Sequence, residues 1–286
     1  MTNTTEQVSP ENKGKLDRLY KDSLICSVIV NYVASDMTRA GIKIDPNIDA
    51  LAHCQLEDEA SRLNIWDGIY NTILQGRLYG GAVGILVIKG ENMEEELNVS
   101  KIKKGTFVGI ATVDRWVITQ TSDANFIMIE KSVNNSEIAG KKIHKSRCFF
   151  RFGIESEKEL TRDGKTWGRS VLDGVFERIS RYLDTDNENR DEKENHDDIR
   201  DAIIYFRQKV AKGIPEDMFP ILFGSFFKKL NPLEISLETD YFKRNLQAQN
   251  RELYSVVDKT YKVMAKSLGF SITKNFGFEF YPANMR

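Results

Sequence analysis

The sequence predicts an α+β fold, with helices at the start of the chain, a run of antiparallel strands in the middle and a long C-terminal helix. Apolar residues recur at helical spacing over residues 16–37 and again over residues 238–268. Between them, over residues 105–152, short β-branched and aromatic segments alternate with turn residues. Because the strands follow the helices instead of alternating with them, we expect antiparallel pairing.

Five elements are expected before residue 90. Gly41 is a plausible cap for the first helix, and Asn64 is a candidate N-cap for the third. The dense apolar run that follows the third helix is typical of a buried strand. The five elements, in order, are a helix over Leu16–Met37, a short strand over Ile42–Ile44, helices over His53–Leu63 and Ile65–Leu78, and a strand over Val83–Lys89.

The glycine-rich segment from Gln75 to Ile88 superficially resembles a nucleotide-binding loop. A phosphate cradle runs from strand through glycines to helix, because the amides at a helix N-terminus point at the anion. Here the order is reversed, so the glycines follow a helix C-terminus, which repels phosphate. We therefore interpret Gly80 and Gly81 as allowing a tight exit from the helix and close packing. Replacing Gly80 with valine should lower solubility without affecting nucleotide binding.

The middle and end of the chain continue the mixed pattern. Turn residues at 90–92, 134–136 and 140 separate the strands, Ser170 is a reasonable N-cap for a helix over residues 170–179, and Gly269 is a cap for the long helix. The long helix exceeds what a small core needs, so part of it should pack on another element or subunit. The predicted strands cover Gly105–Asp114, Trp116–Gln120, Phe126–Glu130, Lys142–His144, Cys148–Phe152 and Phe276–Tyr281.

Composition limits the function classes. The 286 residues are 41% hydrophobic and 29% charged, which suits a soluble protein with a substantial core. A net charge of −1 gives no overall basic field for nucleic acid or an anionic membrane. The apolar runs are too short to span a bilayer, and we expect neither a signal peptide nor a membrane segment. An odd number of unpaired cysteines favours a reduced, intracellular protein.

A search for a reaction centre assigns no catalytic, cofactor-binding or metal-binding residue. The three histidines are isolated, and the cysteines read as small apolar residues. The acidic run over residues 184–201 lacks the glycine of a calcium loop, and Glu94–Glu96 is typical of a solvated turn. Two clusters mix aromatic and basic residues as single-strand binders do, although inward packing of the aromatics is favoured: Cys148–Arg151 and Phe226–Lys229.

Six separated motifs, in order, nevertheless resemble one family, the phage portal proteins of the DUF1073 type, also described as Acb1-like N-terminal. The resemblance covers most of residues 16–282. The motifs are Ala34-Ser-Asp-Met-Thr-Arg39, Gly76-Arg-Leu-Tyr-Gly-Gly-Ala82, His144-Lys-Ser-Arg147 before Phe149-Phe-Arg-Phe152, Trp167-Gly-Arg-Ser-Val-Leu-Asp-Gly-Val-Phe-Glu177, Phe206-Arg-Gln-Lys-Val-Ala211 with Gly213-Ile-Pro215 and Leu222-Phe-Gly224, and Glu238-Thr-Asp-Tyr241 with Gln247 and Gln249.

The resemblance implies a structural role without chemistry of its own. Portal subunits form a ring, usually dodecameric, at one capsid vertex; DNA passes through its channel, and the ring docks the terminase and the head–tail connector. The expected partners are thus other copies of the chain, those two proteins and non-specific double-stranded DNA, with no membrane. The expected location is the virion capsid vertex, and the bacterial host cytoplasm during assembly.

The resemblance also suggests a domain plan: a flexible tail over residues 1–15, a portal wing-like α+β region over 16–183, an acidic connector over 184–198, and a returning segment over 199–286 in the same domain. Family members usually carry several dozen further residues where the acidic connector stands, so the chain resembles a portal shortened in its middle and at its C-terminus. A decayed prophage portal is therefore one alternative, and an adaptor that binds a partner through the long helix is another.

An enzymatic alternative comes from the same resemblance. Some proteins that share this module carry an anti-CBASS phosphodiesterase for cyclic oligonucleotides, which needs the pattern His-x-Thr/Ser twice. The three histidine sites read His53-Cys-Gln, His144-Lys-Ser and His196-Asp-Asp, so only His144 fits.

Overall fold

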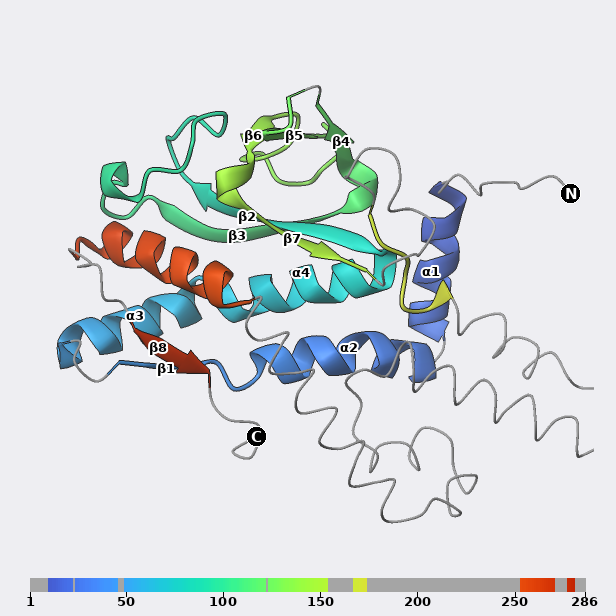
Figure 1. Cartoon of the computed structure of the whole chain (residues 1–286), viewed down its shortest axis with the longest axis horizontal. Helices are drawn as coiled ribbons and strands as arrows, with labels where there is room; N and C mark the ends of the chain where they lie inside the picture. Colours follow the sequence, from blue (N-terminus) through green and yellow to red (C-terminus); the bar gives the residue numbers. More distant parts are fainter. Residues whose placement is uncertain are drawn as a thin grey trace, which may run out of the picture. The chain divides into compact units, whose positions relative to one another are not determined.

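A computed structural model describes residues 10–22, 24–45, 49–121, 123–153, 167–173, 253–270 and 277–280 (Figure 1). The chain divides into two compact units. The first unit comprises residues 1–33, 76–81 and 152–242, and the second comprises residues 34–75, 82–151 and 243–286. The fold is α+β, as the sequence predicts. The acidic connector, the segment over residues 199–252 and the motifs within it lie outside the described residues.

The core of the second unit is a three-stranded sheet with the order β3-β2-β7, formed by Phe107–Asp114, Gly81–Ile88 and Cys148–Phe152. Strand β2 is buried along its whole length, which confirms the buried strand predicted over residues 83–89. It pairs antiparallel with β3, from Ala82 opposite Asp114 to Ile88 opposite Phe107. Such continuous burial accounts for the uninterrupted apolar sequence of β2.

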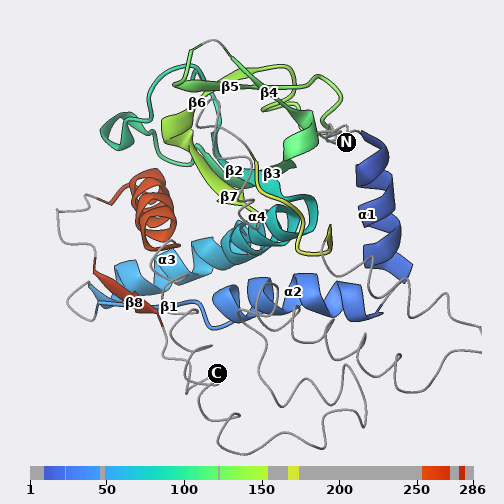
Figure 2. The ribbon, with the colours of Figure 1, turned by 45° about the vertical axis from the view of Figure 1, so that its right-hand side comes forward.

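Helices pack along one face of this sheet in the second unit (Figures 1 and 2). Helix α4 (Ile65–Tyr79) lies against β3, where the Thr72 and Thr112 hydroxyl oxygens are 2.8 Å apart. At Gly68 the approach is so close that an added Cβ would lie 2.7 Å from Ile110 Cβ. Helix α3 (Ala50–Arg62) precedes α4. The predicted helices over residues 53–63 and 65–78 are therefore confirmed, with α3 beginning earlier than expected.

Asn64 lies at the boundary between α3 and α4 and belongs to both helix ends. Its backbone φ is +49°, and its N–H donates to the carbonyl of Ser61 at 3.1 Å. This left-handed conformation ends α3, as asparagine or glycine does after a helix C-cap. No side-chain hydrogen bond from Asn64 to the start of α4 is present among the described residues. Its carbonyl also accepts the N–H of Gly68 at 3.0 Å, the first intrahelical bond of α4, so Asn64 occupies the predicted N-cap position through its backbone.

The C-terminal helix is described over residues 253–268 and ends in a Schellman motif. Gly269, at φ +97°, donates its N–H to the carbonyl of Lys266, and Phe270 donates its N–H to the carbonyl of Ala265. The predicted cap at Gly269 is therefore confirmed. The expected start of this helix, residues 238–252, lies outside the described part. The predicted apolar stripe is buried at Leu253, Val257, Tyr261 and Met264.

Two further small sheets complete the second unit. In one, β4 (Ile118–Gln120), β5 (Phe126–Ile129) and β6 (Lys142–His144) pair antiparallel in that order. In the other, β1 (Ile42–Ile44) pairs antiparallel with β8 (Phe278–Phe280), a strand distant in sequence. Every strand predicted in these segments is present, although 3-10 turns replace parts of the expected ends.

The N-terminal helices belong largely to the first unit and correct one prediction. The single helix expected over residues 16–37 is two helices, α1 (Pro10–Asp22) and α2 (Leu24–Thr38). Residues 10–15, expected in a flexible tail, form the start of α1. Proline suits the first position of a helix, where its missing N–H is not needed. The sequence did not predict the start of α1 because this helix is mostly polar. Among its described side chains, Leu16 is the one buried apolar residue.

Within the described residues, no helix is long and apolar enough to cross a membrane.

Candidate functional site

The one histidine that fits the phosphodiesterase pattern is used inside a turn. His144 ends β6, and its Nδ1 lies 2.8 Å from Ser146 Oγ and 3.2 Å from the Ser146 amide nitrogen that donates to it. The Ser146 hydroxyl oxygen in turn accepts the N–H of Leu97 at 2.7 Å. The histidine and the serine of this motif therefore fasten the connection between β6 and β7.

The other histidines supply no second motif in the described structure. His53 lies on α3, with Nε2 3.6 Å from the Glu57 carboxylate one helical turn away. His196 lies outside the described residues. Among the residues that are described, no cluster of three or more histidine, cysteine, aspartate or glutamate side chains could hold a metal ion.

The cysteines are all free thiols and differ in their environments. Cys26 and Cys148 are buried, whereas Cys54 is exposed on α3. Burial raises the pKa of the Cys148 thiol to about 12, although the nearby positive charges of Lys259, Lys145 and Arg147 oppose this shift. Cys148 therefore stays protonated at neutral pH and is a poor nucleophile.

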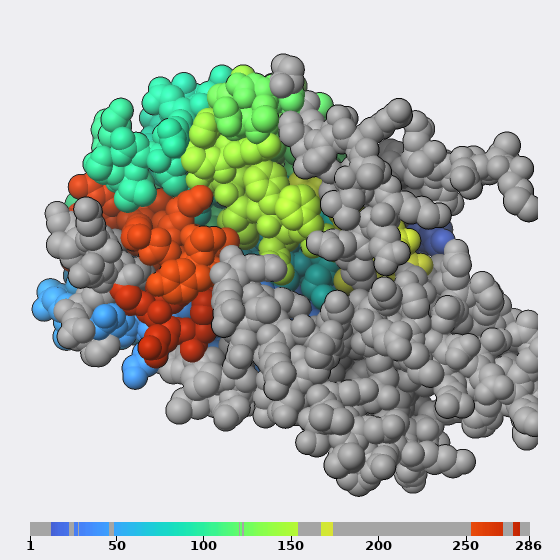
Figure 3. All heavy atoms as spheres, in the orientation of Figure 1, coloured from blue at the N-terminus to red at the C-terminus, as the bar shows by residue number. Residues whose placement is uncertain are grey.

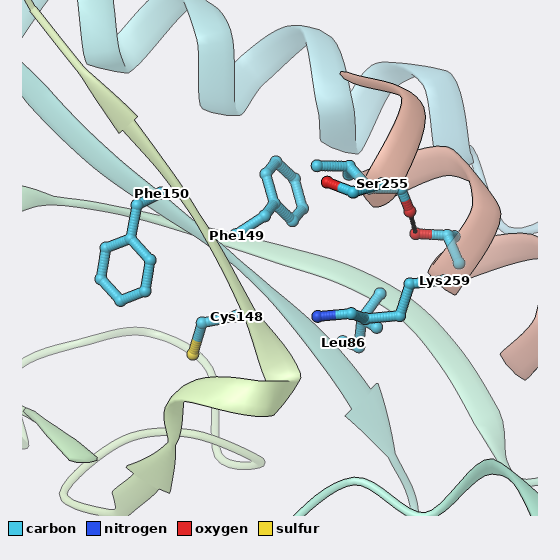
Figure 4. A pocket seen from close by; sticks show the side chains of 8 residues that line it. Leu86, Cys148, Phe149, Phe150, Ser255 and Lys259 are labelled. Atoms are coloured by element: carbon cyan, nitrogen blue, oxygen red, sulfur yellow. Dashed lines mark hydrogen bonds between the residues drawn. The ribbon is translucent and has the colours of Figure 1, made fainter. Parts of the chain in front are cut away.

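A pocket of ≈ 230 Å³ lies between β7, β2 and the C-terminal helix (Figure 4). Leu86, Phe149 and Phe150 provide apolar and aromatic walls. Lys259 provides the cation, and its Nζ donates to the carbonyl of Ser146 at 3.0 Å. In the space-filling view, β7 and the C-terminal helix meet on the same face of this unit (Figure 3). Residues from three distant parts of the sequence form this pocket, so no local pattern predicted it.

The glycine-rich segment is a close crossing of backbones in the first unit. Gly80 follows α4 with φ +79°, and its carbonyl accepts the N–H of Gly153 at 2.9 Å. An added Cβ at Gly81 would lie 2.3 Å from the Trp167 ring, and one at Gly168 would lie 2.6 Å from the Gly153 carbonyl carbon. We call Gly80, Gly81, Gly153 and Gly168 the glycine junction. It confirms the predicted helix-to-strand order and the predicted close packing.

Polar side chains in the same motifs fasten neighbouring segments. Arg77 donates to the carbonyls of Ile29 and Val30 at 2.8 and 3.1 Å. The Ser170 hydroxyl accepts the N–H of Leu172, while the Asp173 carboxylate accepts the N–H of Ser170 at 2.9 Å. This reciprocal pair is a capping box and confirms Ser170 as an N-cap. The rest of the helix predicted after Ser170, residues 174–179, lies outside the described residues.

A buried ion pair fastens the second unit. The Arg147 side chain is 2% exposed, and it pairs with the Glu91 carboxylate at 2.8 Å. It also donates to the Glu95 carbonyl at 2.9 Å. The Glu94–Glu96 residues around this carbonyl are exposed, which agrees with the solvated turn predicted there. In the described structure, these motifs therefore stabilise the fold.

Comparison with known proteins identifies the family of the chain. The family model described as phage portal protein matches residues 15–196, which is more than half of the chain. The chain therefore belongs to the phage portal protein family. It is also 31% identical, over 181 residues, to a protein named anti-CBASS protein Acb1 from Sphingomonas paeninsulae. That match covers 59% of this chain but 28% of the relative, so the chain spans less than a third of the length of this relative.

Proposed function

We propose that this chain is a structural subunit of a phage or prophage portal ring, through which DNA is packaged and ejected. Family membership over residues 15–196 is the observation that carries this proposal. The capping, glycine and arginine contacts support it, because they give structural roles to motifs shared with the family. On this proposal the subunit works at a capsid vertex with the terminase and the head–tail connector.

The mass of the full chain in solution tests this proposal. Native mass spectrometry and negative-stain microscopy should show a closed ring of many copies at high protein concentration. A mass that stays at one copy at every accessible concentration would contradict a working ring and would favour the decayed adaptor.

A second candidate function follows from the similarity to the anti-CBASS protein. On this alternative, the chain would act on cyclic oligonucleotides, with His144 as its candidate acid or base. The contacts of His144 with Ser146 disfavour it, because both side chains already serve the turn. Incubation with cyclic dinucleotides tests it: turnover that is lost in His144→Ala but retained in His53→Ala would establish the enzyme and displace the structural proposal.

The adaptor alternative predicts that substitutions on the surface of the C-terminal helix abolish partner binding. The helical periodicity of the sequence points to the apolar stripe for such substitutions, but the structure shows that the stripe is unsuitable. Leu253 and Val257 lie on the apolar stripe of the C-terminal helix, but both are fully buried in the second unit. Replacing them with aspartate would disrupt the packing of the helix and would not report on a partner. Tyr254 is about half exposed on the same helix, but its ring stacks on Phe278 with centroids 4.4 Å apart, so Tyr254→Phe, which keeps this stacking, is the suitable surface change for a pull-down comparison.

A further inference from the structure

The pocket beside Lys259 is large enough to admit an apolar side chain and smaller than a typical small-molecule site. Its ≈ 230 Å³ falls below the roughly 300–1,000 Å³ of typical small-molecule pockets. Its walls are aromatic and apolar at Phe149, Phe150 and Leu86, and its polar groups come from the C-terminal helix. An apolar side chain with an acidic neighbour would match these walls better than a cofactor would.

The pocket has a positive environment. Lys259 lines it, and the Lys145 ammonium lies 5.9 Å from the centre of the Phe150 ring, which also lines it. Arg147, the third cation in this region, is neutralised by Glu91. An occupant carrying a carboxylate near its apolar group would therefore be favoured over one carrying a cation.

Four large apolar residues are exposed among the described side chains, and one of them matches these requirements. Three do not: Val108 follows Lys103 and Lys104 in the chain, Phe152 follows Arg151, and Tyr254 adjoins the pocket on its own helix. The fourth, Leu51, is 66% exposed in the first turn of α3.

The surroundings of Leu51 are acidic. Asp49 precedes it as the N-cap of α3, and exposed Asp58 lies seven residues after Leu51, about two helical turns away on the same face. Exposed Cys54 also lies on this face. Helix α3 contributes no residue to the pocket, so the two features are separate surfaces of one unit. A contact between two different surfaces of identical subunits is heterologous, and such a contact generates a closed ring when its rotation closes and an open filament when it does not.

We infer that the pocket receives the Leu51 side chain of a second copy of this chain, with Asp58 of that copy facing Lys259 and Lys145. This inference rests on the proposed ring and names one contact within it. It commits to a second copy, because each half of the contact is present on the same chain and their charges are opposite.

Site-directed cross-linking tests the contact directly. Cys54 is the exposed native thiol, whereas Cys26 and Cys148 are buried. A Ser255→Cys change places a second thiol on the exposed rim of the pocket. A short bismaleimide should then link Cys54 of one copy to position 255 of the next and give a ladder of multimers on a denaturing gel. The matched control, Thr119→Cys on exposed β4, should give no ladder.

Substitution of the inserted side chain gives the second measurement. Leu51→Asp should require at least about tenfold more protein for assembly, because an apolar side chain no longer leaves water. Val108→Asp, a change at another exposed apolar residue of the unit, should assemble like the wild type. Circular dichroism should show that both variants remain folded.

The outcomes separate this contact from the ring itself. A wild-type ring with no 54–255 ladder, or an unchanged ring in Leu51→Asp, would overturn the contact and leave the portal proposal standing. A wild-type chain that stays at one copy and gives no ladder would overturn both. A ladder that disappears in Leu51→Asp supports the contact whatever the final number of subunits.

Discussion

At the scale of single residues, the glycines near residue 80 have a steric role. A glycine-rich run in a sequence indicates either a ligand or a close backbone approach, and neighbouring elements decide between them. Here the helix comes first, and the space above Gly81 is filled by the Trp167 ring. The glycine and tryptophan motifs, which are distant in the sequence, are thus two sides of one contact.

We expect Gly81→Ala to lower the free energy of unfolding by about 1–3 kcal/mol, because the new methyl group overlaps the Trp167 ring. Gly14→Ala is the matched control in the same unit. It lies in α1 with no atom within 4 Å of an added Cβ, so alanine should be neutral or stabilise by about 0.5–1 kcal/mol. Urea denaturation compares the two. Equal stability of Gly81→Ala and the wild type would contradict the steric role.

Two ion pairs provide a second comparison between residues. The Arg147–Glu91 pair is buried on the arginine side, whereas the Arg62–Glu59 pair lies on the surface of α3. Removing Arg147 leaves Glu91 and the Glu95 carbonyl without this partner, so Arg147→Ala should destabilise by about 3–5 kcal/mol. Arg62→Ala should change stability little, because water replaces an exposed partner. Thermal denaturation of both variants checks this ranking, and a similar loss in each would contradict it.

At the scale of elements, the sequence predicted those whose apolar pattern matches their burial. Strand β2 is buried throughout and reads as a continuous apolar run. Along strand β3, buried residues such as Phe107 and Val113 alternate with more exposed ones, and this alternation also predicted a strand. The start of α1 was missed because its sequence is mostly polar, and the break before α2 was missed because no proline or glycine separates the two helices. The pairing of β1 with β8 and the pocket beside Lys259 depend on contacts between distant residues, which local patterns do not contain.

The packing of the C-terminal helix within the second unit should make stability depend on alkaline pH. Burial raises the pKa of the Cys148 thiol from 9.0 to about 12, and burial raises the pKa of the Tyr261 hydroxyl from 10.0 to about 12. The folded state therefore holds both protons more tightly than the unfolded state does. Their contribution to stability is complete below about pH 9 and is lost as the pH rises toward about 12.

We expect the urea midpoint to stay constant from about pH 7 to 8.5 and to fall above about pH 9. In Cys148→Ala the fall should begin about one pH unit higher, because Tyr261 alone remains to titrate. In Tyr261→Phe the fall should still begin near pH 9, at the unfolded pKa of Cys148. A midpoint that does not change up to about pH 11 in the wild type would show that neither group resists ionisation in the folded state.

At the scale of the whole molecule, the motifs that the structure describes stabilise the fold. These motifs cap helices, close turns and permit close backbone approach. The thiol in the pocket is held protonated. If the chain assembles into a ring, as proposed, its stability should depend on the concentration of the protein.

Thermal unfolding at different protein concentrations provides the last test. If folded copies associate, mass action stabilises the native state, so the midpoint of unfolding should rise over about a hundredfold increase in concentration. The rise should be smaller in Leu51→Asp, which removes one side of the proposed contact, and unchanged in Val108→Asp. Differential scanning fluorimetry measures all three proteins in parallel. A wild-type midpoint that is independent of concentration would contradict assembly, whereas equal slopes in the wild type and Leu51→Asp would place the subunit contact on another surface.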